Sequence, residues 1–258
     1  MSRNIFKWIS RWKKFFILII VLLTILYFLQ DYLVPFYYEP NYERRHVKEL
    51  IIDVNGYIGD INQFTSNDTL YIRWLGVNDF RSLGSVDADI IVIIAHGLAM
   101  EDENKGGIAG LGGYALETSE PSTLFNALKH PLLILSGSIV RGKVSGLGER
   151  IALTKNIFMF SKSFDGKTIV LITCGTNQTY FFAKEFILHG AERVFYTNTT
   201  TSMDKVKRIL NVITTIEDLD SLKHALLNES LYIIEKGDYM ENPWPIICFG
   251  CRYATGLP

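Results

Sequence analysis

The chain has 258 residues, enough for one good-sized domain, and 48% of them are hydrophobic, as in an ordinary globular protein. A net charge of −1 gives no sign of a nucleic-acid partner. Three cysteines (Cys174, Cys248 and Cys251) are too few for a disulfide scaffold.

The N-terminus carries the longest apolar run. "FFILIIVLLTILYFL", Phe15 to Leu29, has no charge, and with residues 30–34 it approaches the ~20 residues that cross a bilayer. Residues 1–14 form a basic tail, which the positive-inside rule places in the cytoplasm. No small-x-small cleavage site follows the run, so an uncleaved anchor is predicted rather than a signal peptide. We expect a single-pass cell-membrane protein with segment 15–34 in the bilayer and the rest outside the cell.

Residues 35–66 are expected to form a membrane-proximal linker and a helix. Between residues 41 and 64 the apolar positions have helical spacing, with a break predicted at Asn55-Gly56. These positions are Val47, Leu50, Ile51, Val54, Ile58 and Ile61. The main domain is predicted to span 67–258.

Continuous apolar runs predict the central strands of this domain. "TLYIRWLG" (69–76) looks like a first strand, while "DIIVIIA" (89–95) and "KTIVLIT" (167–173) indicate strands buried on both faces. Such strands are typical of a parallel sheet with helices on each side. The expected fold is therefore α/β, with a mostly parallel central sheet in an α/β/α sandwich.

The C-terminal third continues this alternation. A helix face formed by Phe182, Phe186 and Ile187 ends at His189-Gly190, and a strand is expected at 194–196. Further helices are predicted at about 202–213 and 219–227, and "NPWPIICFG" (242–250) as a last strand. The glycine-rich segment 101–149 is expected to hold peripheral strands and loops.

His96 and Cys174 each come directly after a buried strand and are each followed by a glycine, Gly97 and Gly175. Functional groups collect at the carboxyl ends of strands in an open parallel sheet. If the two strands are adjacent, both side chains reach one cleft. An imidazole beside a thiol favours the thiolate, which is the nucleophilic form. The pattern predicts a catalytic pair.

The order of apolar strand, His-Gly, apolar strand and Cys resembles the caspase-like cysteine peptidases, and most closely their CHAT-type branch. "CGTN" (174–177) resembles the turn that carries the nucleophile there. "FAKEFILHGAERVFYTN" (182–198) resembles the following helix, Gly-Ala corner and strand, and "NPWPIICFG" the terminal strand. The likeness covers roughly Thr69 to Gly250.

This resemblance implies peptide-bond hydrolysis through an acyl-enzyme, with a protein or peptide as substrate. It implies that Cys174 is the nucleophile and His96 the general base, with the backbone N–H groups of Gly97 and Cys174 as the oxyanion hole. Ile172 stands where metacaspases and legumains carry an acidic residue, and the caspase Gln-Ala-Cys-x-Gly pattern is absent. No Arg/Lys or Asp preference is therefore implied, and no third orienting residue is visible in the sequence.

Two other functions, that of an inactive interaction protein and that of a nucleotide-binding module, are compatible with parts of the sequence. Cys174 and His96 taken singly also suit a buried structural thiol and a strand-end histidine, as in an inactive caspase-like surface protein that keeps the fold for interaction. "GSIVRGKV" (137–144), preceded by the strand-like "PLLIL" (131–135), is a near miss for a phosphate-binding loop. It lacks the Ser/Thr that binds Mg²⁺, because Val144 stands there.

No other motif in the sequence predicts a cofactor or a metal site. Cys248 and Cys251 supply two of the four ligands that a zinc site needs, and outside the cell they form a possible local disulfide. The acidic run "EDEN" (101–104) is expected to be a solvated loop near the His96 strand. Glycosylation sequons occur at Asn67, Asn177, Asn198 and Asn228, and we expect Asn177, three residues from Cys174, to be unmodified.

Overall fold

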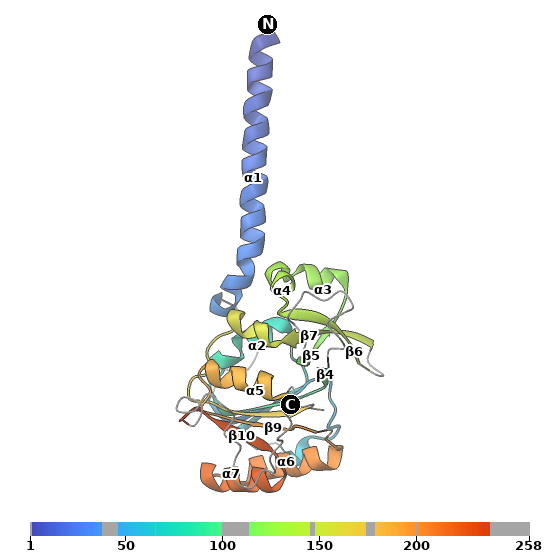
Figure 1. The fold of residues 1–258 in the computed structure, drawn as a ribbon, viewed down its shortest axis with the longest axis vertical. Helices are drawn as coiled ribbons and strands as arrows, with labels where there is room; N and C mark the ends of the chain where they lie inside the picture. Colours follow the sequence, from blue (N-terminus) through green and yellow to red (C-terminus); the bar gives the residue numbers. More distant parts are fainter. Residues whose placement is uncertain are drawn as a thin grey trace, which may run out of the picture.

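A six-stranded sheet forms the centre of the domain, in the strand order β10-β9-β8-β3-β1-β2 (Figure 1). The computed structural model describes residues 2–37, 46–64, 66–99, 114–144, 148–173, 179–199 and 201–237. Neighbouring strands are parallel except for β10, which is antiparallel to β9. The strands are β1 (Val47–Asp53), β2 (Thr69–Ile72), β3 (Ala88–Ala95), β8 (Thr168–Thr173), β9 (Arg193–Tyr196) and β10 (Tyr232–Glu235).

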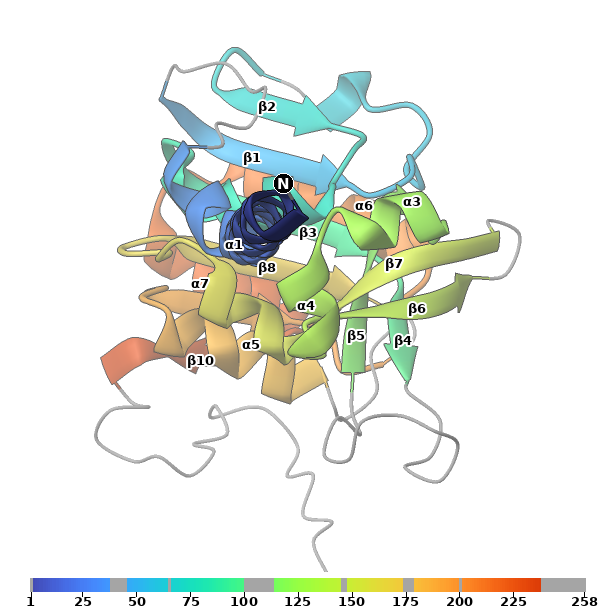
Figure 2. The ribbon, with the colours of Figure 1, turned by 90° about the horizontal axis from the view of Figure 1, so that it is seen from above.

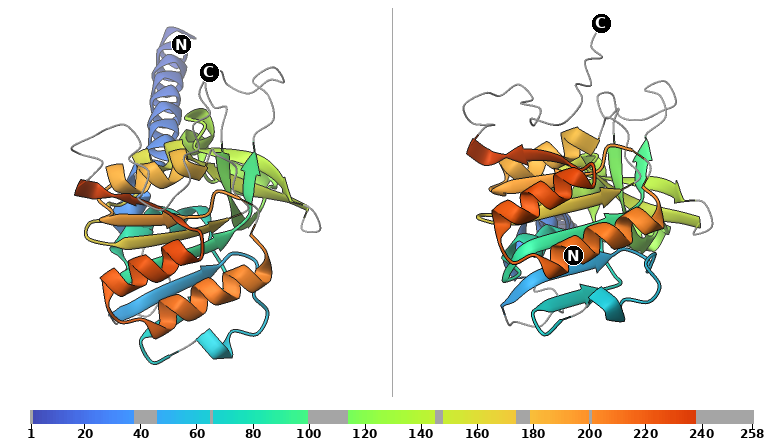
Figure 3. Two further views of the ribbon diagram at one scale, coloured as in Figure 1. Left: turned by 60° about the horizontal axis from the view of Figure 1, so that its bottom comes forward. Right: turned by 90° about the horizontal axis from the view of Figure 1, so that it is seen from below.

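Helices cover both faces of this sheet because its central strands are apolar on both sides. Ile91 and Ile93 of β3 belong to one core cluster, while Val92 and Ile94 belong to the other. The first cluster also contains residues of α2 (Val77–Ser82), η3 (Lys155–Phe160) and α5 (Thr179–Leu188). The second contains residues of α6 (Met203–Thr215) and α7 (Leu219–Asn228), the orange helices across the sheet in Figure 3. Each buried aliphatic side chain contributes about 1.5–3 kcal/mol.

A second, antiparallel sheet lies beside the central one, in the order β4-β5-β7-β6. Its strands are β4 (Gly97–Ala99), β5 (Tyr114–Pro121), β6 (Ile139–Val144) and β7 (Gly148–Thr154). Two short helices, α3 (Leu124–Leu128) and α4 (Pro131–Leu135), connect β5 to β6, and single turns η1 (Asn62–Phe64) and η2 (Leu83–Ser85) complete the elements. Because β4 begins directly after His96, this sheet borders the carboxyl edge of β3 (Figure 2).

Several sequence predictions are confirmed. The three apolar runs form β2, β3 and β8, the sheet is mostly parallel, and the helix and strand after residue 178 are α5 and β9. The two later helices are α6 and α7, and segment 114–144 forms peripheral strands outside the central sheet. The strand β10 was not predicted. The predicted strand 242–250 lies outside the described residues.

Two local predictions are wrong. The helix expected between 41 and 64 is replaced over Val47–Asp53 by strand β1. Its apolar run is buried on both faces between β2 and β3, so the helical spacing was coincidental. The strand-like "PLLIL" is helix α4, which begins with proline at its first turn. The stretch noted as a near miss for a phosphate-binding loop ends in strand β6, "IVRGKV", which pairs with β7 along its length.

The N-terminal helix α1 (Ser2–Tyr37) leaves the domain as a long single helix. Its side chains are described from Phe15 to Asp31 and at Leu33, and most of the apolar ones are exposed. Counting the described residues alone, no helix combines the length and the apolar character that crossing a membrane requires.

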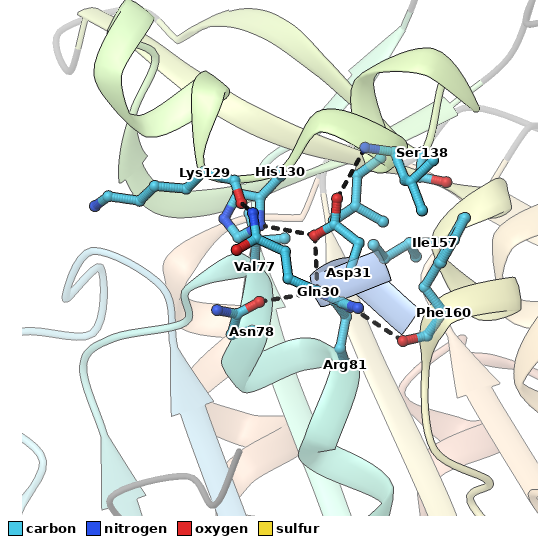
Figure 4. Close-up of polar contacts among 12 residues, drawn as sticks. Gln30, Asp31, Val77, Asn78, Arg81, Lys129, His130, Ser138, Ile157 and Phe160 are labelled. Atoms are coloured by element: carbon cyan, nitrogen blue, oxygen red, sulfur yellow. Dashed lines mark hydrogen bonds and ion pairs between the residues drawn. The ribbon is translucent and has the colours of Figure 1, made fainter. Parts of the chain in front are cut away.

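A buried polar cluster fixes the base of α1 to the domain (Figure 4). Asp31 is fully buried, and its carboxylate lies 3.5 Å from Nη1 of the equally buried Arg81 and 3.5 Å from Nδ1 of His130. It also accepts a hydrogen bond from the Leu132 backbone N–H at 2.8 Å. Arg81 in turn donates from Nε to the Phe160 carbonyl at 3.0 Å. The Asp31 carboxylate on α1 thus links this helix to Arg81 on α2 and to His130 at the start of α4.

Candidate active site at the carboxyl edge of the sheet

His96 lies at the point where the buried strand β3 leaves the central sheet. The preceding residues Ile90 to Ala95 are buried, whereas His96 is only partly buried, and Gly97 then begins β4. The His96 carbonyl accepts a hydrogen bond from the Glu117 backbone N–H at 3.0 Å. The histidine is therefore held between the two sheets by its backbone, with its side chain at the carboxyl edge.

The strand that leads to Cys174 is the neighbour of β3. β3 and β8 are parallel, and their last residues, Ala95 and Thr173, are partners in register. His96 and Cys174 are the next residues along each strand, so the prediction that the two strands are adjacent is confirmed. Cys174 itself, with Gly175 and Asn177, lies outside the described residues, and its pairing with His96 stays a prediction.

Thr197, directly after the neighbouring strand β9, fixes the end of β8 by two hydrogen bonds. The Thr197 hydroxyl accepts a hydrogen bond from the Thr173 backbone N–H at 2.9 Å and donates one to the Thr173 carbonyl at 2.6 Å. Thr197 is fully buried directly after β9. One side chain therefore takes the place of a strand partner where β8 ends, and fixes the backbone immediately before Cys174.

The turn after β1 brings a tyrosine against His96. The Asp53 carboxylate accepts hydrogen bonds from the backbone N–H groups of Tyr57 and Ile58 at 2.7 and 2.9 Å, which closes a tight turn. Asn55 has a φ of 78°, in the left-handed region that asparagine tolerates. The Tyr57 ring meets the His96 ring edge to face, with centroids 4.7 Å apart.

A buried carboxylate from β5 completes the cluster. Glu117 accepts hydrogen bonds from the Tyr57 hydroxyl at 2.6 Å and from the Asn55 amide at 2.9 Å. Burial raises the pKa of the Glu117 carboxyl above its ordinary value of 4.5, against the opposing effects of the Tyr57 hydrogen bond, of the charge on His96 and of a backbone hydrogen bond from His96. Burial, together with the bond to Glu117, also raises the pKa of the Tyr57 hydroxyl. Tyr57 therefore stays protonated and donates.

This arrangement supplies the orienting group that the sequence did not reveal. The Glu117 backbone N–H binds the His96 carbonyl, while the Tyr57 ring packs against the imidazole and restricts its orientation. A histidine that alternates between neutral and charged forms needs such a neighbour for general acid–base chemistry. The one signal in the sequence is that Glu117 directly follows three apolar residues in "YALETSE" (114–120). Its meaning depends on which strand β5 pairs with, and the sequence does not show this.

The cluster lies at the switch point of the sheet topology. The chain runs from β1 outward to β2 and then returns to the other side of β1 as β3, so the strand order reverses between β1 and β3. Open α/β sheets bind ligands outside the carboxyl ends of the strands at such a point. Tyr57 follows β1 and His96 follows β3, which places both at this position.

The other predicted site residues are only partly covered by the structure. Gly97, expected to contribute an oxyanion-hole N–H, is described as the first residue of β4, paired with Leu116. Cys248, Cys251 and the acidic run 101–104 lie outside the described residues. Among the sequons, Asn67 and Asn228 have exposed side chains and Asn198 is partly buried.

Comparison with known proteins identifies no relative: no protein-family model matches the chain, and no curated protein sequence matches it significantly. The fold and the carboxyl-edge cluster are therefore the basis for a functional assignment.

Proposed function

We propose that the chain is a membrane-anchored cysteine endopeptidase of the caspase-like type, with Cys174 as nucleophile and His96 as general base. The observation that carries the proposal is the register of β3 and β8. Ala95 pairs with Thr173, so His96 and Cys174 follow adjacent parallel strands at one edge of the sheet. The sequence resemblance to CHAT-type peptidases supports the same assignment.

The proposed chemistry uses groups on or shortly after five strands, β1, β3, β4, β5 and β8. The Cys174 thiolate attacks the substrate carbonyl, and the N–H groups of Gly97 and Cys174 stabilise the oxyanion. His96 takes the thiol proton and later gives it to the leaving amine, which breaks the peptide bond and leaves an acyl-enzyme. Water then releases the acyl group. Glu117 and Tyr57 act as positioning residues for His96.

We further propose that the predicted anchor segment 15–34 holds the domain at the cell membrane, with the uncharged run Phe15 to Leu29 in the bilayer, Asp31 in the domain and the basic tail in the cytoplasm. The support is the uncharged run from Phe15 to Leu29 in a continuous helix, whose apolar side chains point away from the domain. The segment includes Tyr32 and Val34, whose side chains lie outside the described residues.

The first experiment measures the alkylation rate of Cys174 against pH by mass spectrometry in the full chain. We expect fast labelling below the ordinary thiol pKa of ~8.5. His96→Ala should slow it, whereas His224→Ala, at an exposed histidine of α7, should leave it unchanged. The chain labelled after denaturation gives the rate of a freely accessible Cys174 thiol.

Slow labelling that ignores His96 would overturn the catalytic pair and favour the inactive interaction protein. If the pair is established, peptide-library cleavage follows, and Cys174→Ala should abolish turnover while leaving the fold intact.

A further inference from the structure

The helices α3 and α4 expose an unusual number of large apolar side chains for ten residues. Leu124 and Phe125 are 77% and 73% exposed, Leu135 is 63% exposed, and none of the α3 side chains is buried. We call this surface the apolar shoulder and define it by five residues: Leu124, Phe125, Leu128, Ile134 and Leu135. Contiguous apolar surface of this kind marks a contact with a partner or a membrane.

The apolar shoulder is fixed beside the apolar stretch of α1. The Tyr27 hydroxyl donates a hydrogen bond to the Leu128 carbonyl, and Gln30 Nε2 donates one to the Lys129 carbonyl at 3.1 Å. Figure 1 shows α3 and α4 on the side of the domain from which α1 leaves. Leu23 and Leu26, exposed apolar residues of α1, precede Tyr27 by four residues or fewer.

The length of the uncharged run identifies the occupant as lipid. Fifteen residues from Phe15 to Leu29 rise about 22 Å in a helix, less than the ~30 Å of a hydrocarbon core. The next charged residue, Asp31, is buried in the domain. A helix this short can span only if the bilayer thins or if the domain surface around Tyr27 meets the acyl boundary. The apolar shoulder is the surface at that level.

The charge beside the shoulder also suits a lipid headgroup region. The Lys129 ammonium lies 4.9 Å from the centroid of the Phe125 ring and contacts Asn126 Oδ1 at 3.0 Å. A lysine at the edge of an apolar surface can place its charge among phosphates while a neighbouring aromatic ring enters the acyl layer.

We propose that the apolar shoulder inserts into the leaflet next to the domain and forms a second membrane contact beside α1. This inference rests on the proposed anchor. The partner is the bilayer itself, and the contact fixes how close the domain lies to the membrane.

The test places the photo-cross-linker p-benzoylphenylalanine at single positions of the full chain, reconstituted in phosphatidylcholine/phosphatidylglycerol vesicles. The shoulder is sampled at Phe125 and, as a second site, at Leu135. Leu22 of α1 samples the anchor. The matched control is Leu219, an exposed leucine of α7, the helix that Figure 1 shows at the end of the domain opposite α1. Lipid adducts are quantified by mass spectrometry after irradiation.

We expect adduct yields at Phe125 and Leu135 several-fold above that at Leu219. Lipid adducts at Leu22 with none at Phe125 and Leu135 would leave the anchor intact and overturn the shoulder contact. Protein–protein adducts at Phe125 would also overturn it, in favour of a second copy of the chain. Absence of lipid adducts at Leu22 as well as at Phe125 and Leu135 would remove both proposals. Adducts at the shoulder without any at Leu22 would support a surface contact and refute the span.

Discussion

Two buried carboxylates, Glu117 and Asp31, are held by partners of different kinds. Glu117 accepts hydrogen bonds from two neutral donors, Tyr57 and Asn55, and its backbone N–H donates to the His96 carbonyl. Asp31 instead pairs with the permanently charged Arg81. A carboxylate held by neutral donors can exchange a proton at moderate cost, whereas the ion pair of Asp31 with Arg81 ties α1 to α2. The first arrangement suits chemistry and the second suits a fixed joint.

The largest expected effect comes from breaking the fixed joint. Arg81→Leu should lower the free energy of unfolding by about 3–5 kcal/mol, because Asp31 stays buried without its charged partner. Urea denaturation of the full chain in mild detergent measures it. The double variant Asp31→Leu/Arg81→Leu should recover part of the loss. Arg208→Leu, whose ion pair with Glu229 is exposed, should cost less than about 1 kcal/mol. Equal costs for Arg81→Leu and Arg208→Leu would contradict the comparison.

A smaller, pH-dependent effect is expected at Glu117. Its folded-state pKa lies above 4.5 because burial disfavours the charged form, so the unfolded chain releases the proton first as the pH rises. Wild-type stability should therefore fall through the interval between 4.5 and the folded pKa, by about 1.4 kcal/mol for each unit of separation. Glu117→Gln does not titrate and should gain stability relative to wild type over that interval.

Denaturation at a series of pH values checks this sign, with Glu149→Gln at an exposed side chain as control. A relative stability of Glu117→Gln that stays flat, or that falls as the pH rises, would show that the Glu117 site favours the anion after all.

The smallest effect on stability is expected from removing the Tyr57 hydroxyl, which donates a hydrogen bond to Glu117. Tyr57→Phe keeps the ring that packs against His96 and removes the hydroxyl bound to Glu117, at a cost of about 1 kcal/mol. Because that hydrogen bond lowers the pKa of Glu117, its loss should move the midpoint of the Glu117-dependent stability change to higher pH. Tyr71→Phe, which removes a hydroxyl from Asp53 instead, should leave the midpoint in place. Equal shifts in both variants would mean that Tyr57 has no specific role.

The central strands could be predicted because their residue pattern fits only one arrangement in a folded domain. A run such as Ile90 to Ile94 has no polar face, so it must be covered on both sides, and a parallel sheet between helix layers provides this. Strand β1 was mistaken for a helix because Val47, Leu50, Ile51 and Val54 satisfy the helical period as well. The deciding fact is its pairing with β2 and β3, which no local pattern contains.

The residues of the candidate site likewise fall into two groups: those that the sequence reveals and those that only the tertiary structure reveals. His96 and Cys174 could be singled out because each stands at a visible change from apolar to polar sequence at a strand end. Glu117 could not, because its contact with His96 depends on how β5 joins the second sheet, 21 positions further along the chain. Tyr57 depends likewise on a turn built by Asp53 and Asn55.

The joint at Asp31 has a directional consequence. Figure 2 looks along α1, and the arrows of β1 and β2 run across the view, so the carboxyl edge of the sheet faces sideways from the helix. Since Asp31, Arg81 and His130 join helix and domain, the domain cannot swivel independently of α1. With α1 anchored as proposed, His96 travels at one constant height above the bilayer. Under the proposed peptidase function, a substrate must therefore place its scissile bond at that height above the bilayer, whatever its sequence.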